Sequence, residues 1–134
     1  MDLLLIYPYY NDDTSLFKFP PLGLGYIASF VRGAGYSVGI LDCTFFDEEE
    51  AVTKAKSLKP RVIGISSMSS LKEYTIRLAK RLRGSCELLV AGGPLPTVEP
   101  ASFVKLFDIV VIGEGEKTML EVLQALDKGA PPVG

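Results

Sequence analysis

The sequence contains no histidine. Histidine is the commonest general base near neutral pH and the usual partner of a serine or cysteine nucleophile. It is also a frequent ligand of catalytic zinc. Its absence argues against conventional hydrolytic catalysis by this chain alone.

Cysteine is also scarce, with only Cys43 and Cys86 in the chain. Two cysteines are too few for a disulfide scaffold, and their spacing is not that of a metal site. Each lies near the end of an expected strand, where buried free thiols are common. We therefore expect both to be structural.

Neither an excess of positive charge nor a long apolar run is present. Lys and Arg number 14 against 16 Asp and Glu, so no basic stripe indicates a nucleic-acid partner. The densest basic run, residues 80–83, falls at an expected helix end, where cations suit the dipole. No apolar run reaches the ~20 residues of a membrane span. The apolar start lacks a basic lead, and Pro8 interrupts it. We expect a soluble, cytoplasmic protein.

Five short apolar runs among the 134 residues predict strands at residues 2–7, 37–41, 61–66, 87–91 and 108–112. Most are continuous Val, Ile and Leu, which is typical of strands covered on both faces. Helix-like segments alternate with them, so we expect one α/β domain with a parallel sheet. The predicted fold is doubly wound, flavodoxin-like or Rossmann-like, with strand order 2-1-3-4-5 and helices on both faces.

The expected helices follow from apolar spacing and from Pro and Gly punctuation. The first begins at Pro21, has apolar residues at Tyr26, Ile27, Phe30 and Val31, and stops at Gly33 and Gly35. The others cover residues 48–58, 71–83, 98–106 and 116–127. In the last helix Leu120, Leu123 and Leu126 are expected to face inward. We assign residues 1–128 to the domain and 129–134 to the start of a linker.

In open parallel sheets the ligand crevice lies beyond the carboxyl ends of the strands. After the fourth strand, Gly92, Gly93 and Pro94 permit a ligand to approach the backbone, although a tight turn is the alternative. After the third, residues 66–70 (SSMSS) supply four hydroxyls, more than one helix N-cap needs.

Two further loops have unusual compositions. Residues 113–116 (GEGE) lead into the last helix, where the carboxylates could cap the helix or meet ligand hydroxyls. The segment 7–21 is long and aromatic, and could cover a flat ring or pack on the domain's own edge. Together the four loops predict an extended, ring-bearing ligand with a nucleotide-like tail.

Several blocks resemble the amino-terminal B12-binding domain of B12-dependent radical SAM proteins. They are residues 20–28 (PPLGLGYIA), 35–38 (GYSV) with Asp42, 62–66 (VIGIS), 91–94 (AGGP) and 111–116 (VIGEGE). The blocks occur in the family's order and cover nearly the whole chain. Each is weak alone, and the ordered set is fairly specific.

The resemblance implies a cobalamin on the carboxyl edge of the sheet, with its benzimidazole tail between strands. The implied cofactor-binding residues are Ser66, Ser67, Met68, Ser69, Gly92, Gly93, Pro94, Leu95, Gly113, Glu114, Gly115, Glu116, Pro8 and Leu22. In this family the iron–sulfur cluster and S-adenosylmethionine belong to a separate, following radical SAM domain. The three-cysteine cluster motif of that domain is not in this chain.

The chain departs from the family pattern at two points. Leu95 stands where many members have histidine, and the histidine segment that ligates cobalt in B12 mutases is absent. Any bound cobalamin would therefore be base-off without a histidine ligand, and the pocket would set its electronic state.

We expect a cobalamin-binding module of a larger methyltransferase-type enzyme, with no turnover of its own. The alternative is an interaction or scaffold domain with a degenerate pocket, which Leu95 and Pro96 would favour. A phosphotransfer receiver would need an aspartate where Ser66 stands. A flavin site would need a phosphate loop after the first strand, which the residues after Tyr7 do not resemble.

Overall fold

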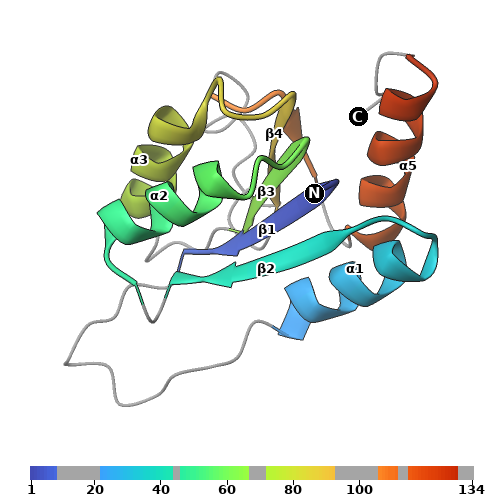
Figure 1. Cartoon of the computed structure of the whole chain (residues 1–134), viewed down its shortest axis with the longest axis horizontal. Helices are drawn as coiled ribbons and strands as arrows, with labels where there is room; N and C mark the ends of the chain where they lie inside the picture. Colours follow the sequence, from blue (N-terminus) through green and yellow to red (C-terminus); the bar gives the residue numbers. More distant parts are fainter. Residues whose placement is uncertain (9–21, 44–45, 67–71, 93–105, 112–114, 130–134) are drawn as a thin grey trace.

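The structure is a computed structural model, and it describes residues 1–8, 22–43, 46–66, 72–92, 106–111 and 115–129. These residues contain a five-stranded parallel sheet (Figure 1). Its strands are β1 (Leu3–Tyr7), β2 (Val38–Asp42), β3 (Val62–Ser66), β4 (Leu88–Gly92) and β5 (Ile109–Val110). Their order is β2-β1-β3-β4-β5, which confirms the predicted doubly wound topology.

The helices of the described residues are α1 (Leu22–Gly33), α2 (Glu48–Ser57), α3 (Lys72–Leu82) and α5 (Glu116–Asp127). Helices α1 and α5 cover one face of the sheet, and α2 and α3 cover the other (Figure 1). Within these residues no helix is long and apolar enough to cross a membrane. The helix predicted at 98–106 falls outside the described residues, except for Leu106.

The strands form because their apolar side chains are buried on both faces. In β1 no side chain is more than 8% exposed. Alternate residues enter two separate core clusters, Leu4 and Ile6 toward α2 and α3, and Leu3 and Leu5 toward α1 and α5. This explains why the sequence of β1 is a continuous apolar run rather than an alternating one.

Local signals fix the helix ends. Asp47 caps α2 by accepting a hydrogen bond from the Glu50 backbone N–H at 2.8 Å, and the Glu50 carboxylate accepts one from the Asp47 N–H at 3.5 Å. This capping box satisfies two N–H groups that the helix leaves free. Beyond α1, Gly35 has φ +98°, a conformation that a residue with a Cβ rarely adopts.

The predicted apolar face of α1 is partly wrong. Val31 is fully buried, but Tyr26 is 69% exposed and Phe30 is 47% exposed. Leu24 and Ala28 complete the buried stripe instead. Apolar residues occur almost all round this helix, so their spacing does not decide which side meets the sheet.

The predicted inner face of α5 is also displaced. Leu123 is fully buried and Leu126 packs partly against the core, but Leu120 is only half-buried. Met119 and Val122 are buried instead, at 4% and 2% exposure. The helix is therefore rotated relative to the prediction. Its Met119 side chain lies over Gly64 of β3.

An ion-pair network holds the carboxyl end of α5 at the amino edge of the sheet. The Arg61 guanidinium lies 2.9 Å from the Asp127 carboxylate, 3.4 Å from Asp2 and 3.8 Å from Glu87. The Tyr36 hydroxyl donates to Asp127 at 2.7 Å. These contacts lower the carboxyl pKa of Asp127, chiefly through the Tyr36 hydrogen bond.

The basic run at the end of α3 forms specific ion pairs. Arg81 pairs with Glu48 at 3.2 Å and with Glu49 at 2.8 Å, which joins α3 to the start of α2. Arg83 pairs with Asp108 at 3.4 Å, just before β5. The run is therefore used to tie neighbouring elements together.

Candidate functional site

The carboxyl ends of four strands place Asp42, Tyr7, Ser66 and Gly92 in one row across the sheet, called here the terminal row. Tyr7 pairs with Asp42, and Ser66 pairs with Gly92, in the strand register. The residues just before Tyr7 and Ser66 also pair with each other. The predicted Ser66 and Gly92 loops are therefore neighbours, as a shared ligand would require.

The terminal row lies on the face covered by α1 and α5. Side chains alternate along a strand, and Tyr7 belongs to the same core cluster as Leu3 and Leu5. Tyr7 is 8% exposed, whereas Asp42, Ser66 and Gly92 are half-buried. The row thus begins where the core ends and faces the start of both helices.

Below the terminal row the space between β3 and α5 is closed by packing at Gly64. A Cβ built at Gly64 would lie 2.8 Å from Met119 Cε and 3.1 Å from Leu5 Cδ2. Both distances are shorter than ordinary carbon contacts of about 3.5–4.0 Å. Glycine is required here because Met119 occupies the volume that a side chain would need.

At Gly92 the situation is reversed. Among the described residues, the nearest atom to a Cβ built there is Val111 Cβ, at 3.9 Å. That is an ordinary contact, so no described side chain fills the space above Gly92. Among the described residues, the face is therefore closed at Gly64 and leaves room for a further carbon atom at Gly92, which lies two residues beyond the level of Gly64.

The starts of α1 and α5 approach each other beside this opening. A Cβ at Gly115 would lie 3.2 Å from Ile27 Cδ1, so this glycine lets the two helices pack closely. Gly115 is also the N-cap of α5 and provides no side-chain cap. Glu116 is the first helical residue, where its negative charge suits the helix dipole.

The structure describes some of the predicted site residues and not others. Ser66 and Gly92 end β3 and β4, Pro8 follows β1, Leu22 begins α1, and Gly115 and Glu116 begin α5, so all are at the carboxyl edge. The remaining predicted residues lie outside the described residues: Ser67, Met68, Ser69, Gly93, Pro94, Leu95, Gly113 and Glu114. Their assignment stays a prediction.

Two members of the terminal row were missing from the predicted site. Tyr7 was assigned to the end of a strand and to the start of the long loop that follows it, without being named as a site residue, and Asp42 was noted only as part of a family block. Their signal is positional: each is the last residue of its strand and lies on the same face as Ser66 and Gly92. Recognising it requires the register between strands, which the sequence does not state.

Neither thiol is placed for chemistry. Cys43 is 1% exposed, and burial raises the pKa of its thiol to about 12. Cys86 is half-buried, and burial raises its pKa also. Both are free, and nowhere in the described part of the chain do three His, Cys, Asp or Glu residues gather as a metal site. On α3, the Thr75 hydroxyl is buried and has no hydrogen-bond partner within the described part of the chain.

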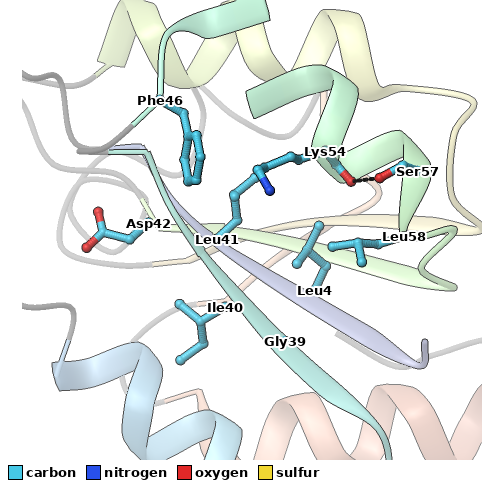
Figure 2. Close-up of a pocket in the computed structure, with 9 residues that line it drawn as sticks. All are labelled: Leu4, Gly39, Ile40, Leu41, Asp42, Phe46, Lys54, Ser57 and Leu58. Carbon is cyan, nitrogen blue, oxygen red and sulfur yellow. Dashed lines mark hydrogen bonds between the residues drawn. The ribbon is translucent and has the colours of Figure 1, made fainter. Parts of the chain in front are cut away.

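A groove of about 370 Å³ runs along strand β2 (Figure 2). Figure 2 shows Lys54 of α2 and Leu58, the residue that follows α2, on one side of the strand and Ile40 on the other. Its complete lining is Leu4, Gly39, Ile40, Leu41, Asp42, Phe46, Lys54, Ser57 and Leu58. Apart from Asp42 the groove contains none of the terminal row, so we do not assign it to the cofactor.

Comparison with known protein families shows which family the chain belongs to. Residues 12–123 match the B12 binding domain family. The chain is a B12-binding domain. Cobalamin is the cofactor of this family. Among the described residues, a Cβ at Gly92 would meet only Val111 Cβ, at the ordinary contact distance of 3.9 Å, so the described edge is compatible with a ligand group beside Gly92.

Relatives of this B12-binding domain include an uncharacterized methyltransferase, PH0819, of Pyrococcus horikoshii. It is 36% identical over 121 residues, which cover 82% of this chain and 25% of that protein. The anaerobic magnesium-protoporphyrin IX monomethyl ester cyclase of Rubrivivax gelatinosus is 27% identical over 139 residues, covering 96% of this chain and 25% of the cyclase. The domain thus spans about a quarter of these relatives.

The fold matches that of one part of the cobalamin-dependent S-adenosylmethionine radical enzyme OxsB. The structure of OxsB with aqua-cobalamin and S-adenosylmethionine bound matches with a TM-score of 0.83. The match covers 97% of this B12-binding domain and 19% of OxsB, at 17% sequence identity. At that identity the likeness establishes the fold alone.

Proposed function

We propose that this domain binds cobalamin with its nucleotide tail between the β3–β4 edge and the starts of α1 and α5. The observation that carries this proposal is the contrast between Gly64 and Gly92. In the part of the chain that the structure describes, the α1/α5 face is closed at Gly64 by Met119, whereas a Cβ at Gly92 would make only an ordinary contact with Val111. A long heterocyclic tail needs such a slot, whose inner end is apolar and whose outer end has polar groups.

The chain's own residues would orient the cofactor rather than ligate its metal. The Ser66 hydroxyl can donate or accept a hydrogen bond at the slot entrance. The first N–H groups of α5, which the Gly115 N-cap leaves without a side-chain partner, can receive an anionic group. No histidine is available, so cobalt receives no imidazole from this chain. When bound, cobalamin supplies the cobalt centre for methyl transfer or related radical chemistry.

We further propose that the domain works within a longer, cytoplasmic radical SAM enzyme of the methyltransferase type. The support is the methyltransferase name of PH0819 and the S-adenosylmethionine radical chemistry named for OxsB. In that arrangement residues 129–134 begin the linker. The iron–sulfur cluster and S-adenosylmethionine would belong to the following domain, and nucleic acid and membrane are not partners.

Titration with hydroxocobalamin tests the binding. The purified domain should co-elute with cobalamin in gel filtration, and the visible spectrum should shift to the base-off form. The shift is expected because a tail held in the slot cannot ligate cobalt. Free elution at high micromolar cobalamin would contradict the proposal and favour the degenerate interaction domain instead. A retained base-on spectrum would contradict the placement of the tail.

A further inference from the structure

Strand β2 forms one outer edge of the described sheet, and the centre of the strand, residues 39–41, carries none of the charges or prolines usual for an edge. The described sheet ends at β2, whose one neighbouring strand among the described residues is β1 (Figure 1). Its sequence, VGILD, contains neither lysine nor proline, and Ile40 at its centre is 40% exposed. Edge strands that remain single usually carry charges, prolines or bulges that prevent pairing with another strand.

The hydrogen bonds at the start of β2 show which backbone groups point outward. The Ser37 carbonyl accepts from the N–H groups of Asp2 and Leu3, so it points toward β1. Backbone direction alternates along a strand, so Val38, Ile40 and Asp42 direct their N–H and C=O groups to the outer edge. Arg32 of α1 donates to the Val38 carbonyl at 2.7 Å, which is consistent with a carbonyl that points away from β1.

We propose that β2 pairs with β2 of a second copy of the chain, antiparallel, about a two-fold axis at Ile40. The Ile40 N–H of each copy then donates to the Ile40 carbonyl of the other. Antiparallel pairing about residue 40 places Val38 of one copy opposite Asp42 of the other. Because the axis is two-fold, every contact occurs twice.

Charge complementarity favours this partner. Arg32 lies at the Val38 end of β2, and Asp42 is the last residue of the strand. Both side chains lie on the α1 side of the sheet, so the pairing brings Arg32 of each copy to Asp42 of the other. A carboxylate has two oxygens with several acceptor positions, so Asp42 can accept from Arg32 and keep its other contacts.

The surfaces beside β2 suit a second copy. On the α2 side, Leu58 is 41% exposed and lines the groove of Figure 2, so pairing would bury apolar area on both copies. On the α1 side, Gly25 and Ser29 lie seven and three residues before Arg32, on the same flank of the helix. A Cβ at Gly25 would meet no described atom within 4 Å, which leaves room for the second α1.

The association is expected to be weak. Contacts made by one edge strand and its flanks belong to the small class of interfaces, for which dissociation constants are roughly micromolar. Sedimentation velocity over a concentration series of the 134-residue chain should show a monomer–dimer equilibrium. It requires no cobalamin, so its failure and that of the proposed function are separate results.

Charge reversal identifies the contact. Arg32→Asp puts two carboxylates at each contact, and Asp42→Arg puts two guanidinium groups there, so each variant alone should dimerise about 10–100-fold more weakly. Mixing the two variants makes both contacts complementary again and should restore the dimer. A mixture of folded variants that stays monomeric would overturn the proposal.

A backbone variant gives an independent test. Because the Ile40 N–H points outward, Ile40→Pro removes the dimer hydrogen bond and leaves pairing with β1 intact. It should be folded by circular dichroism and monomeric. The matched control is Tyr26→Lys, at a 69% exposed position on the outer side of α1, which should dimerise like the wild type. Wild-type chain that is monomeric throughout, or dimerisation unchanged in Ile40→Pro, would refute the β2 interface.

Discussion

Alanine substitutions at Gly64 and Gly92, two glycines of neighbouring strands on one face of the sheet, should have opposite effects on the stability of the fold. In Gly64→Ala, the new Cβ would lie 2.8 Å from Met119 Cε and 3.1 Å from Leu5 Cδ2. Overpacking of this kind typically costs about 1–3 kcal/mol in the free energy of unfolding. For a domain of this size that corresponds to a melting temperature lower by about 4–10 °C.

In Gly92→Ala, the new Cβ would meet only Val111 among the described residues, at 3.9 Å. We therefore expect the melting temperature to stay level or rise slightly, since alanine in a strand is about 0.5–1 kcal/mol better than glycine. Cobalamin affinity should fall by about tenfold, equivalent to about 1.4 kcal/mol of binding, because the added methyl group would occupy volume that the proposed slot offers to the tail. Thermal unfolding by circular dichroism and a hydroxocobalamin titration measure the two effects.

A double-mutant cycle provides the control. Met119→Ala should cost less stability in the Gly64→Ala background than in the wild type, because it removes the clashing atom. Additive losses would show that Met119 does not occupy the Gly64 volume. The slot reasoning would be refuted by a Gly92→Ala protein that unfolds as early as Gly64→Ala, or by one that binds cobalamin unchanged.

Three other substitutions or conditions have definite expected outcomes. Thr75→Val should raise the free energy of unfolding by about 1 kcal/mol, because it removes a buried hydroxyl without a partner, and a destabilised variant would disprove the missing bond. The pKa of Asp2, through the Ser37 backbone hydrogen bond, and that of Asp127 are lowered by folding. The unfolded state therefore binds more protons in acid, so stability should fall below about pH 4 in urea titrations, less steeply in Asp2→Asn/Asp127→Asn. Cys43 should stay unlabelled by a thiol reagent at pH 8 until the protein unfolds, and fast labelling would contradict its burial and its pKa of about 12.

The strands and their order could be predicted because they depend on strong, local signals. Continuous apolar runs identify buried parallel strands, and alternation with helices restricts the topology to a few arrangements. The side of each helix that packs against the sheet could be predicted less well than the strands. Tyr26 and Phe30 of α1 are as apolar as the buried Val31, and only contact with the sheet distinguishes them. Leu120 and Met119 of α5 are a similar pair, decided by the space over Gly64.

The site could be predicted where it depends on topology. Ser66 and Gly92 were expected at one edge, and the register places them opposite each other. Tyr7 was expected at the start of one of the candidate loops, but its position level with Ser66 and on the same face was not predicted, because both depend on strand pairing and on which face a side chain meets. The space beside Gly92 and the lack of space beside Gly64 depend on the volumes of neighbouring side chains, which the periodicity of the sequence does not describe.

The side chains of the terminal row continue the alternation between the two faces that the buried strand residues follow. The number of residues in a strand therefore determines which face its terminal residue occupies. Deleting one residue within β3 would shift Ser66 to the opposite face and exchange the residues that enter the two core clusters. A single deletion would therefore damage folding and ligand recognition together. Insertions in the loops beyond the row carry no such penalty. Adaptation to another ligand is thus expected to proceed by changes in loop length while the strands keep a constant number of residues.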